Sequence, residues 1–295
     1  MKKYKKINLT VISLFILVSV KAQIIDVHLH SYTDADYWGG RVHPTGIESP
    51  KTADEHLKKT IALMDKHQIE YAVVSGSIES IEKYVKADSR FIPGYMDSEQ
   101  LIPIDRFELL IKEGKIKVFG EVSGVYYGRP LNDPIYSPYL EICEKYEIPV
   151  AYHTGGGPPM TPYRCCPNFR ITLGDPYLVE DVLVKFPKLQ LYLMHGGEVY
   201  FENSVRMMKM YSHLYIDLGV ILWVDPIIKD YGVRLLKLAQ KANVLDRVMF
   251  GTDQMVWPGA ISKSIEFINS LDFLSEDEKR MILYNNAKTF LKISK

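Results

Sequence analysis

The stretch "QIIDVHLHSY" (residues 23–32) carries an apolar run that ends in two histidines one residue apart. Residues i and i+2 of a β-strand point to the same face, so His28 and His30 leave this strand side by side. Two imidazoles at this spacing can hold one cation. The alternative is that they are two polar residues closing an ordinary strand, and the later strands are needed to separate the two interpretations.

Further apolar runs of strand length follow, and amphipathic segments with helical spacing separate them. A parallel strand pair needs a crossover connection, so this alternation indicates a parallel sheet. Eight such units predict an α/β fold, a (β/α)8 TIM barrel. An open dinucleotide-binding sheet is disfavoured because no Gly-x-Gly-x-x-Gly turn follows the first strand. The expected strands are 24–30, 71–76, 91–96, 118–123, 150–155, 191–197, 214–219 and 248–253, and the clearest helices are 53–67, 137–147, 175–186 and 275–292.

The N-terminus has the order of a bacterial secretory signal peptide. A basic start, "MKKYKK", precedes an apolar run over residues 7–20, which is shorter than the roughly 20 residues that span a bilayer. Val20 and Ala22 supply the small residues of a cleavage site. We predict a signal peptide over 1–22, a single domain over 23–295, export to the periplasm or medium, and no stable membrane insertion after cleavage. An uncleaved anchor is the alternative.

Composition narrows the possible partners. The chain has 36 basic and 36 acidic residues and no net charge, so nothing points to nucleic acid or an anionic membrane. The three cysteines, Cys143, Cys165 and Cys166, do not have the spacing of a metal finger. Their odd number leaves at least one thiol unpaired if a bridge forms.

Polar residues capable of chemistry stand at the ends of four of the expected strands. In a barrel these strand ends meet at one face, where the active sites of such folds lie. A lone histidine in such a place is more often structural, but a pair followed by further strand-end matches argues for a metal site. The residues are His28, His30, His153, His195 and Asp253.

The ordered set "DVHLH" (26–30), "YHTG" (152–155), "MHGG" (194–197) and "FGTDQ" (250–254) resembles the amidohydrolase superfamily of metal-dependent barrels. It is most similar to the branch that includes aminocarboxymuconate-semialdehyde decarboxylase, and the similarity runs from Ile24 to about Leu291. The resemblance implies that His28, His30, His153 and Asp253 bind a divalent ion, with Asp253 also taking the proton of the attacking water. It implies that His195 is either a ligand of a second ion or a general acid/base.

Glu121 is the open position in this comparison. Binuclear members usually bridge two ions with a carboxylated lysine or an acidic residue of strand four, and "KVFGEVSG" (117–124) offers Glu121 there. It is otherwise a polar barrel residue or a substrate contact. Histidine and carboxylate ligands suit zinc, the expected metal, with manganese as the alternative. One or two ions therefore remain possible.

The leading functional prediction is a metal-dependent hydrolase of a small ester, lactone or amide-like substrate. The alternative is a metal-dependent non-oxidative decarboxylase of an aromatic or unsaturated acid, and a third reading is a metal-containing binding protein without catalysis. Arg129 and Arg164 are candidates to hold a substrate carboxylate, and His43 is a candidate to line the pocket. The expected partner is a small molecule, and a homo-oligomer is possible.

Overall fold

The computed structural model describes residues 23–293, so the predicted signal peptide over 1–22 lies outside the described residues. Its centre is an eight-stranded parallel sheet in which the strands follow one another in chain order. The strands are β1 (Ile24–His30), β2 (Ile69–Gly76), β3 (Phe91–Tyr95), β4 (Val118–Val122), β5 (Val150–His153), β6 (Leu191–Met194), β7 (Leu214–Asp217) and β8 (Val248–Met249).

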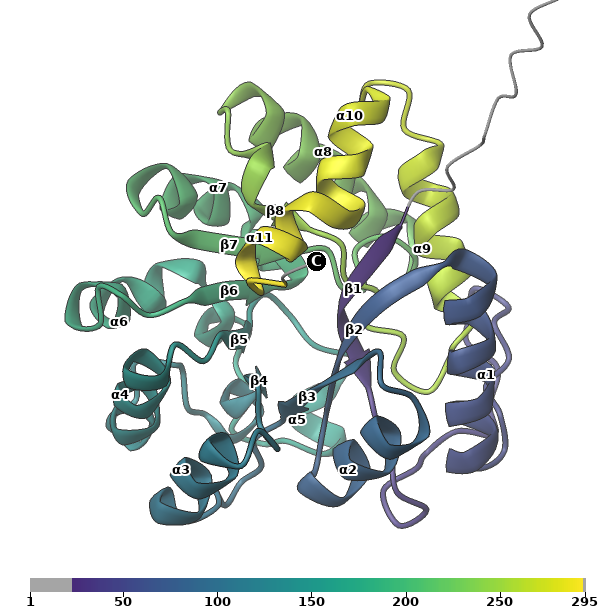
Figure 1. Cartoon of the computed structure of the whole chain (residues 1–295). Helices are drawn as coiled ribbons and strands as arrows, with labels where there is room; N and C mark the ends of the chain where they lie inside the picture. The colour runs from purple at the N-terminus through teal and green to yellow at the C-terminus, as the bar shows by residue number, and fades with distance from the viewer. Residues whose placement is uncertain (1–22, 294–295) are drawn as a thin grey trace, which may run out of the picture.

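Helices connect successive strands and surround the sheet (Figure 1). Among the described residues, no helix is both long and apolar enough to cross a membrane. The α-helices are α1 (Ala53–His67), α2 (Ile78–Ala87), α3 (Ile104–Lys112), α4 (Ser137–Tyr146), α5 (Thr161–Arg164), α6 (Glu180–Lys185), α7 (Phe201–Met210), α8 (Pro226–Lys241), α9 (Ala260–Asn269), α10 (Glu276–Arg280) and α11 (Asn286–Phe290).

The first and last strands meet and close the sheet into a barrel. The backbone N–H of Val27 donates to the carbonyl of Phe250 at 3.0 Å, and the N–H of Asp253 donates to the carbonyl of His28 at 2.7 Å. The predicted TIM barrel is therefore confirmed. The closing contacts also bring the segment after β8 against the end of β1, where the two histidines stand.

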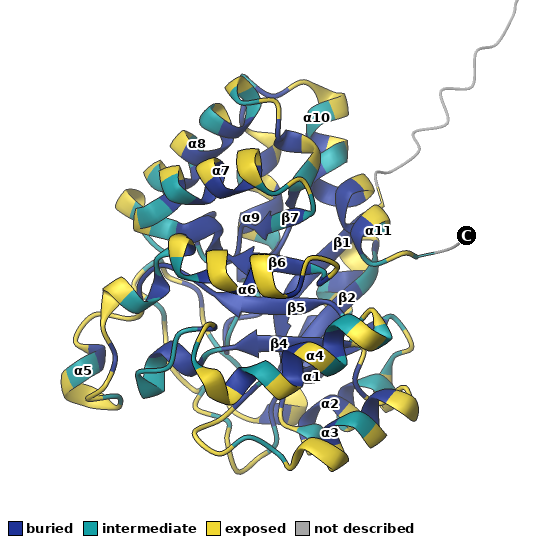
Figure 2. Ribbon diagram, turned by 90° about the vertical axis from the view of Figure 1, so that its left-hand side faces the viewer, coloured by how far each residue is buried: buried dark blue, intermediate teal, exposed yellow. Residues whose placement is uncertain are grey.

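Two apolar layers stabilise the barrel, and both are buried (Figure 2). One fills the interior, where Ile25 and Val27 of β1 pack with Tyr192 of β6. Phe290 of α11 joins this cluster, and α11 lies across one end of the barrel (Figure 1). The other layer packs the outer faces of the strands against the helices. Burial of the apolar surface of these two layers is the main favourable term in folding.

An irregularity in β1 sets the direction of its histidines. The pairing of β1 with β2 shifts register between Asp26 and Leu29. Such a shift changes which residues face inward. The inward positions accordingly pass from Ile25 and Val27 to His28 and His30, while Leu29 packs in the outer layer.

The structure differs from the expected elements mainly near their ends. The eighth strand is paired only over Val248–Met249, because the chain then turns towards β1 and Asp253 adopts a left-handed conformation with φ 48°. The segment 175–186 begins as a 3₁₀ turn, Pro176–Val179, before α6. The closing helix starts at a Ser275–Glu278 capping box but contains a π turn over Met281–Asn285.

Candidate metal centre

The barrel end formed by the carboxyl ends of the strands gathers the polar residues that the sequence singled out. They come from β1, β4 and β5 and from the segments directly after β6 and β8. Each is at least nine-tenths buried. The residues brought together are His28, His30, Glu121, His153, His195 and Asp253.

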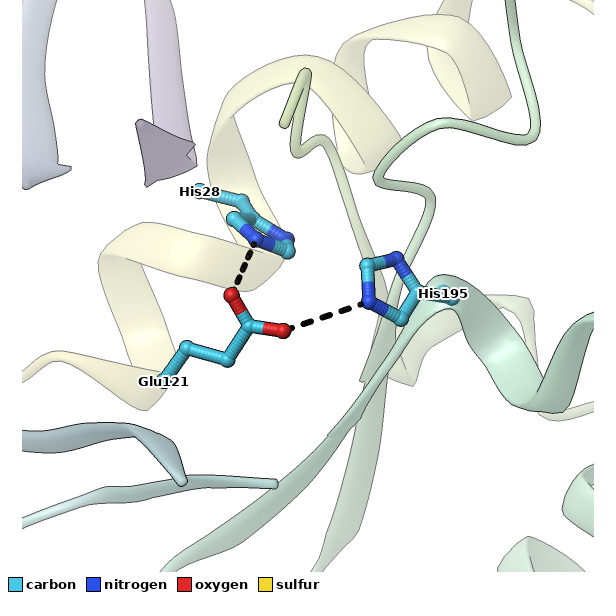
Figure 3. Close-up of side chains that lie close together, drawn as sticks. All are labelled: His28, Glu121 and His195. Carbon is cyan, nitrogen blue, oxygen red and sulfur yellow. Dashed lines mark ion pairs between the residues drawn. The ribbon is translucent and has the colours of Figure 1, made fainter. Parts of the chain in front are cut away.

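Glu121 lies in the middle of this group, and Figure 3 shows its carboxylate between His28 and His195. One oxygen, Oε1, lies 2.5 Å from Nδ1 of His153 and 3.5 Å from Nε2 of His195. The other oxygen, Oε2, lies 3.5 Å from Nε2 of His28 and 3.4 Å from Nε2 of His30. Each carboxylate oxygen therefore faces its own pair of imidazoles.

Asp253 faces the same space from the opposite side. Its Oδ1 atom lies 2.9 Å from Nε2 of His30 and 3.8 Å from Nε2 of His28. Its Oδ2 atom lies 3.9 Å from Nδ1 of His195. This arrangement gives two sets of potential ligand atoms, and within each set the atoms lie within 4.8 Å of one another. One set is His28 with Glu121 and His195, and the other is His28 with His30 and Asp253.

Asp217, at the end of β7, orients two of these groups. Its Oδ2 accepts a hydrogen bond from Nδ1 of His28 at 2.9 Å, and its Oδ1 accepts the backbone N–H groups of His195 at 2.8 Å and Gly219 at 2.9 Å. A proton on Nδ1 of His28 leaves Nε2 as the free ligand atom. In the sequence, Asp217 could be recognised only as a carboxylate at the end of an apolar strand. Its contact with His28 could not be inferred.

Gln254 and Asp26 brace the junction between β1 and the segment after β8. The Gln254 amide accepts from the backbone N–H of His30 at 3.0 Å and donates to the His30 carbonyl at 3.1 Å. The Asp26 carboxylate accepts both the hydroxyl and the N–H of Thr252. Burial raises the pKa of Asp26 to about 7, against the effect of those hydrogen bonds. These contacts fix Asp253 opposite the two histidines.

The backbone at two of the candidate residues is left-handed. His195 has φ 62° and Asp253 has φ 48°, a region that residues other than glycine rarely adopt. Such conformations persist where the surrounding structure holds them, and they cluster at functional sites. Here the Asp217 contact to the N–H of His195 and the His28 contact to the N–H of Asp253 supply that support.

The charges in this group are strongly coupled. Burial opposes ionisation, but the carboxylates of Asp253 and Asp217 still raise the pKa of His28 well above its usual value. Burial likewise acts against ionised Glu121, yet hydrogen bonds from His153 and His195 hold its pKa well below the usual range. His28 therefore carries a proton at a position that a cation would take, and metal binding would release that proton.

Two buried atoms in this group make no hydrogen bond of good geometry among the described residues: Nε2 of His28, and Oδ1 of Asp253 despite its 2.9 Å distance from Nε2 of His30. Leaving a buried polar atom unpaired costs about 1–3 kcal/mol. A cation between them would satisfy both atoms, and imidazole with carboxylate is a donor set for zinc and related divalent ions. The residues present fit a divalent metal ion.

Comparison with known proteins shows the family of this chain. The sequence model of the amidohydrolase family matches residues 25–293, nearly the whole described chain. The chain belongs to the amidohydrolase family. No curated protein matches it.

Solved structures share the barrel fold at low sequence identity. An uncharacterised TIM-barrel protein of Bordetella bronchiseptica has a TM-score of 0.67 and 22% identity, covering 92% of this chain and 98% of that one. A probable 2-pyrone-4,6-dicarboxylic acid hydrolase of Acinetobacter baumannii has values of 0.64 and 13%, covering 92% and 99%. A 5-carboxyvanillate decarboxylase of Novosphingobium aromaticivorans, solved with manganese, has values of 0.61 and 15%, covering 92% and 97%.

A cavity of about 330 Å³ opens beside the candidate metal centre. This is at the small end of the range of about 300–1,000 Å³ for small-molecule sites. His30, Glu121, His153 and Asp253 reach it from the centre. The other lining side chains are aromatic (Tyr32, Trp38, Tyr126), hydroxyl-bearing (Ser31, Ser77, Ser123), methionine (Met96, Met255) and acidic (Asp36), with Gly76 between them.

The three residues predicted to bind substrate do not line this cavity. Arg129 donates to the carbonyl of Glu99 at 2.7 Å, and Arg164 is exposed at the end of α5. His43 lies 4.9 Å from Trp223 and 4.8 Å from Trp257, measured between ring centroids. Their role in substrate binding stays a prediction. The sequence could not show that they lie outside the cavity lining, because it does not reveal loop conformation.

The cysteines divide into a bridge and a free thiol. Cys165 and Cys166, neighbours in the chain after α5, form a disulfide. Cys143 of α4 is free and buried in the outer apolar layer. The long segment that carries the bridge also carries Phe169, whose ring stacks on Tyr126 of the cavity with centroids 5.2 Å apart.

Proposed function

We propose that this chain is a metal-dependent hydrolase that acts on a small ester, lactone or amide-like substrate and holds two divalent ions. The position of Glu121 carries the proposal, because its two oxygens face different imidazole pairs. A carboxylate placed in this way suits a bridge, and two-ion sites serve hydrolysis by holding both the attacking and the leaving oxygen.

The residues would divide into two ligand sets. His28, His30 and Asp253 would hold one ion, and His153 with His195 would hold the other, with Glu121 shared between them. The predicted sharing of one ion by His28, His30, His153 and Asp253 is the single-ion alternative, in which His195 is free for acid/base work. Zinc is the first candidate for the metal. Manganese is the second candidate, supported by the manganese in the similar decarboxylase structure.

The proposed chemistry uses the chain's own groups around the bound substrate. When bound, a divalent ion lowers the pKa of a coordinated water towards about 7 and polarises a carbonyl oxygen. Burial opposes ionisation of Asp253, but the positive charges of His28 and His30 lower its pKa. A bound divalent ion would supply positive charge in place of the protons that it displaces, so Asp253 would be a carboxylate at neutral pH. Asp253 can therefore accept the proton of the attacking water and return it to the leaving group.

Metal counting tests the proposal most directly. We expect two ions per chain by elemental analysis of the purified protein, and one in Glu121→Gln, which keeps the shape but loses the charge. Glu113→Gln, at an exposed glutamate that pairs with Lys115, is the matched control and should retain two. Ester and lactone turnover should fall in Asp253→Asn. Protein that binds neither zinc nor manganese would refute the central proposal.

A decarboxylase is the second candidate, supported by the similarity to the manganese-containing 5-carboxyvanillate decarboxylase. Release of CO2 from aromatic acids, without turnover of esters or lactones, would favour it. Metal-loaded protein inactive in both assays would instead support a binding protein.

The basic and apolar order of residues 1–22 supports export, which we also propose.

A further inference from the structure

We propose that the cavity selects substrates whose remote part, away from the bond that is cleaved, is an uncharged ring and excludes those that carry a carboxylate there. This inference rests on the proposed hydrolase function. It contrasts with the acids named for two of the similar structures, a pyrone dicarboxylic acid and a carboxyvanillate.

The charge of the cavity wall is the first observation. Among residues 23–293, no lysine or arginine lines this cavity, and its acidic side chains are Asp36, Glu121 and Asp253. Glu121 and Asp253 belong to the candidate metal centre, so Asp36 is the charge that a remote substrate group would meet. A buried or half-buried carboxylate needs a cation or several donors to offset its desolvation. The wall supplies no such cation, and the hydroxyls of Ser31, Ser77 and Ser123 already donate to Ser75, Ser80 and Asp97.

Asp36 is placed to repel anions at the cavity mouth. It stands in the exposed loop after β1, where its Oδ1 accepts the N–H of Thr33 at 2.6 Å and the hydroxyl of Thr33 at 2.9 Å. None of the described hydrogen bonds or ion pairs of residues 23–293 involves its Oδ2. Its charge is therefore not offset by a neighbouring cation, and like charge is an effective way to reject a wrong ligand.

Three aromatic side chains supply the attractive surface. Tyr126 packs between His153 and Phe169, with ring centroids 5.1 and 5.2 Å away. Tyr32 packs edge-on against His56, and Trp38 edge-on against Trp257. Fixed, uncharged aromatic faces favour ring contacts rather than ionic ones.

Arg41 is the cation that would change this interpretation if it turned inward. Its guanidinium lies over the outer wall residue Trp38, 5.1 Å from the ring centroid, and it does not line the cavity. Cation–π contact of this kind keeps an exposed arginine in place only weakly. The experiment therefore includes Arg41→Gln.

A pair of ligands matched in shape and different in charge tests the inference. The metal-loaded full chain is titrated with 4-hydroxybenzamide and 4-hydroxybenzoate by calorimetry, and is assayed with 4-acetoxybenzamide and 4-acetoxybenzoate. We expect the amide to bind, and its ester to react by kcat/KM, at least tenfold better than the carboxylate. Asp36→Asn should reduce the ratio of amide affinity to carboxylate affinity at least threefold, because it removes the charge while keeping the Thr33 contacts. Added salt should also reduce this ratio.

The outcomes separate this inference from the hydrolase proposal. Equal or tighter binding of 4-hydroxybenzoate, an unchanged ratio in Asp36→Asn, or failure of both ligands to bind would overturn the charge selection. Carboxylate binding that is lost in Arg41→Gln would also overturn it, by placing a cation in the site. Selective binding of the amide with turnover of neither ester would support the charge selection while contradicting the hydrolase.

Discussion

Oδ2 of Asp217 lies 2.9 Å from Nδ1 of His28, while Oδ1 of the same carboxylate accepts the backbone N–H of His195 at 2.8 Å. One buried side chain thus sets the direction of a β1 imidazole and the backbone after β6. Groups that orient metal ligands in this way affect metal affinity without touching the ion.

The Asp217→Asn variant should weaken metal binding by about 10–100-fold. The asparagine oxygen would keep the two backbone N–H groups, so its NH2 would face Nδ1 of His28 and favour the tautomer with a proton on Nε2. Metal affinity is measured by competition with a chelator. Asp133→Asn, at a partly buried cap of a 3₁₀ turn, is the control. Equal affinity in both variants would mean that the Asp217 contact does not set the tautomer.

Adding a carbon at Gly219 should disturb the same contact from the other side. A Cβ at this position would lie 2.5 Å from Nδ1 of His28 and 3.1 Å from Cβ of Asp253, so the imidazole must move. We expect Gly219→Ala to lose about tenfold or more in metal affinity. Gly259→Ala, whose added Cβ would lie 2.9 Å from the Cγ2 methyl of Ile47, should bind metal normally. Unchanged binding in Gly219→Ala would show that the ring position is not critical.

Metal should stabilise the folded chain. An ion at about 100 times its Kd adds about 2.7 kcal/mol to the free energy of unfolding, which is about 5–10 °C in Tm for a chain of this size. His30→Asn should lose most of this metal-dependent shift in a thermal melt. His67→Asn, at a helix-end histidine that contacts Ser262, should keep it. A shift of equal size in both variants would place the ion elsewhere.

Asp97 should make stability depend on pH. Burial raises the pKa of Asp97 to about 6, although its carboxylate accepts hydrogen bonds from Tyr136 and Ser123. Because the folded pKa exceeds the unfolded value, its stabilising contribution is complete below about pH 4 and is lost as the pH rises through about 6. The stability of the wild type relative to Asp97→Asn should fall by ~2–3 kcal/mol between those limits. Urea unfolding measures it, and a constant difference would contradict the prediction.

The N-terminus can be tested without reference to the barrel. If residues 1–22 form a signal peptide, intact-mass analysis of exported protein should show a chain that begins at Gln23. Replacing Ala22 with a bulky residue should leave the precursor uncleaved. The same replacement at Lys21 is the control. Full-length protein in the cytoplasmic fraction of the wild type would contradict the export proposal.

The sequence by itself determined the barrel and the residues that stand at its carboxyl end. Strand and helix periodicity predict the alternation, and parallel strands must end at one face, so His28, His30, His153, His195 and Asp253 could be placed together without coordinates. Their spacing within each strand is a local property of the chain, which is why the sequence carries it.

Only the tertiary structure decided how these groups face one another. The position of Glu121 between two imidazole pairs, and of Asp217 behind His28, depends on distances across the barrel that strand register and tilt set. The loops decided the rest: Asp36 reaches the cavity, whereas Arg129, Arg164 and His43 do not line it. Loop paths depend on packing between segments distant in sequence, so local pattern cannot fix them.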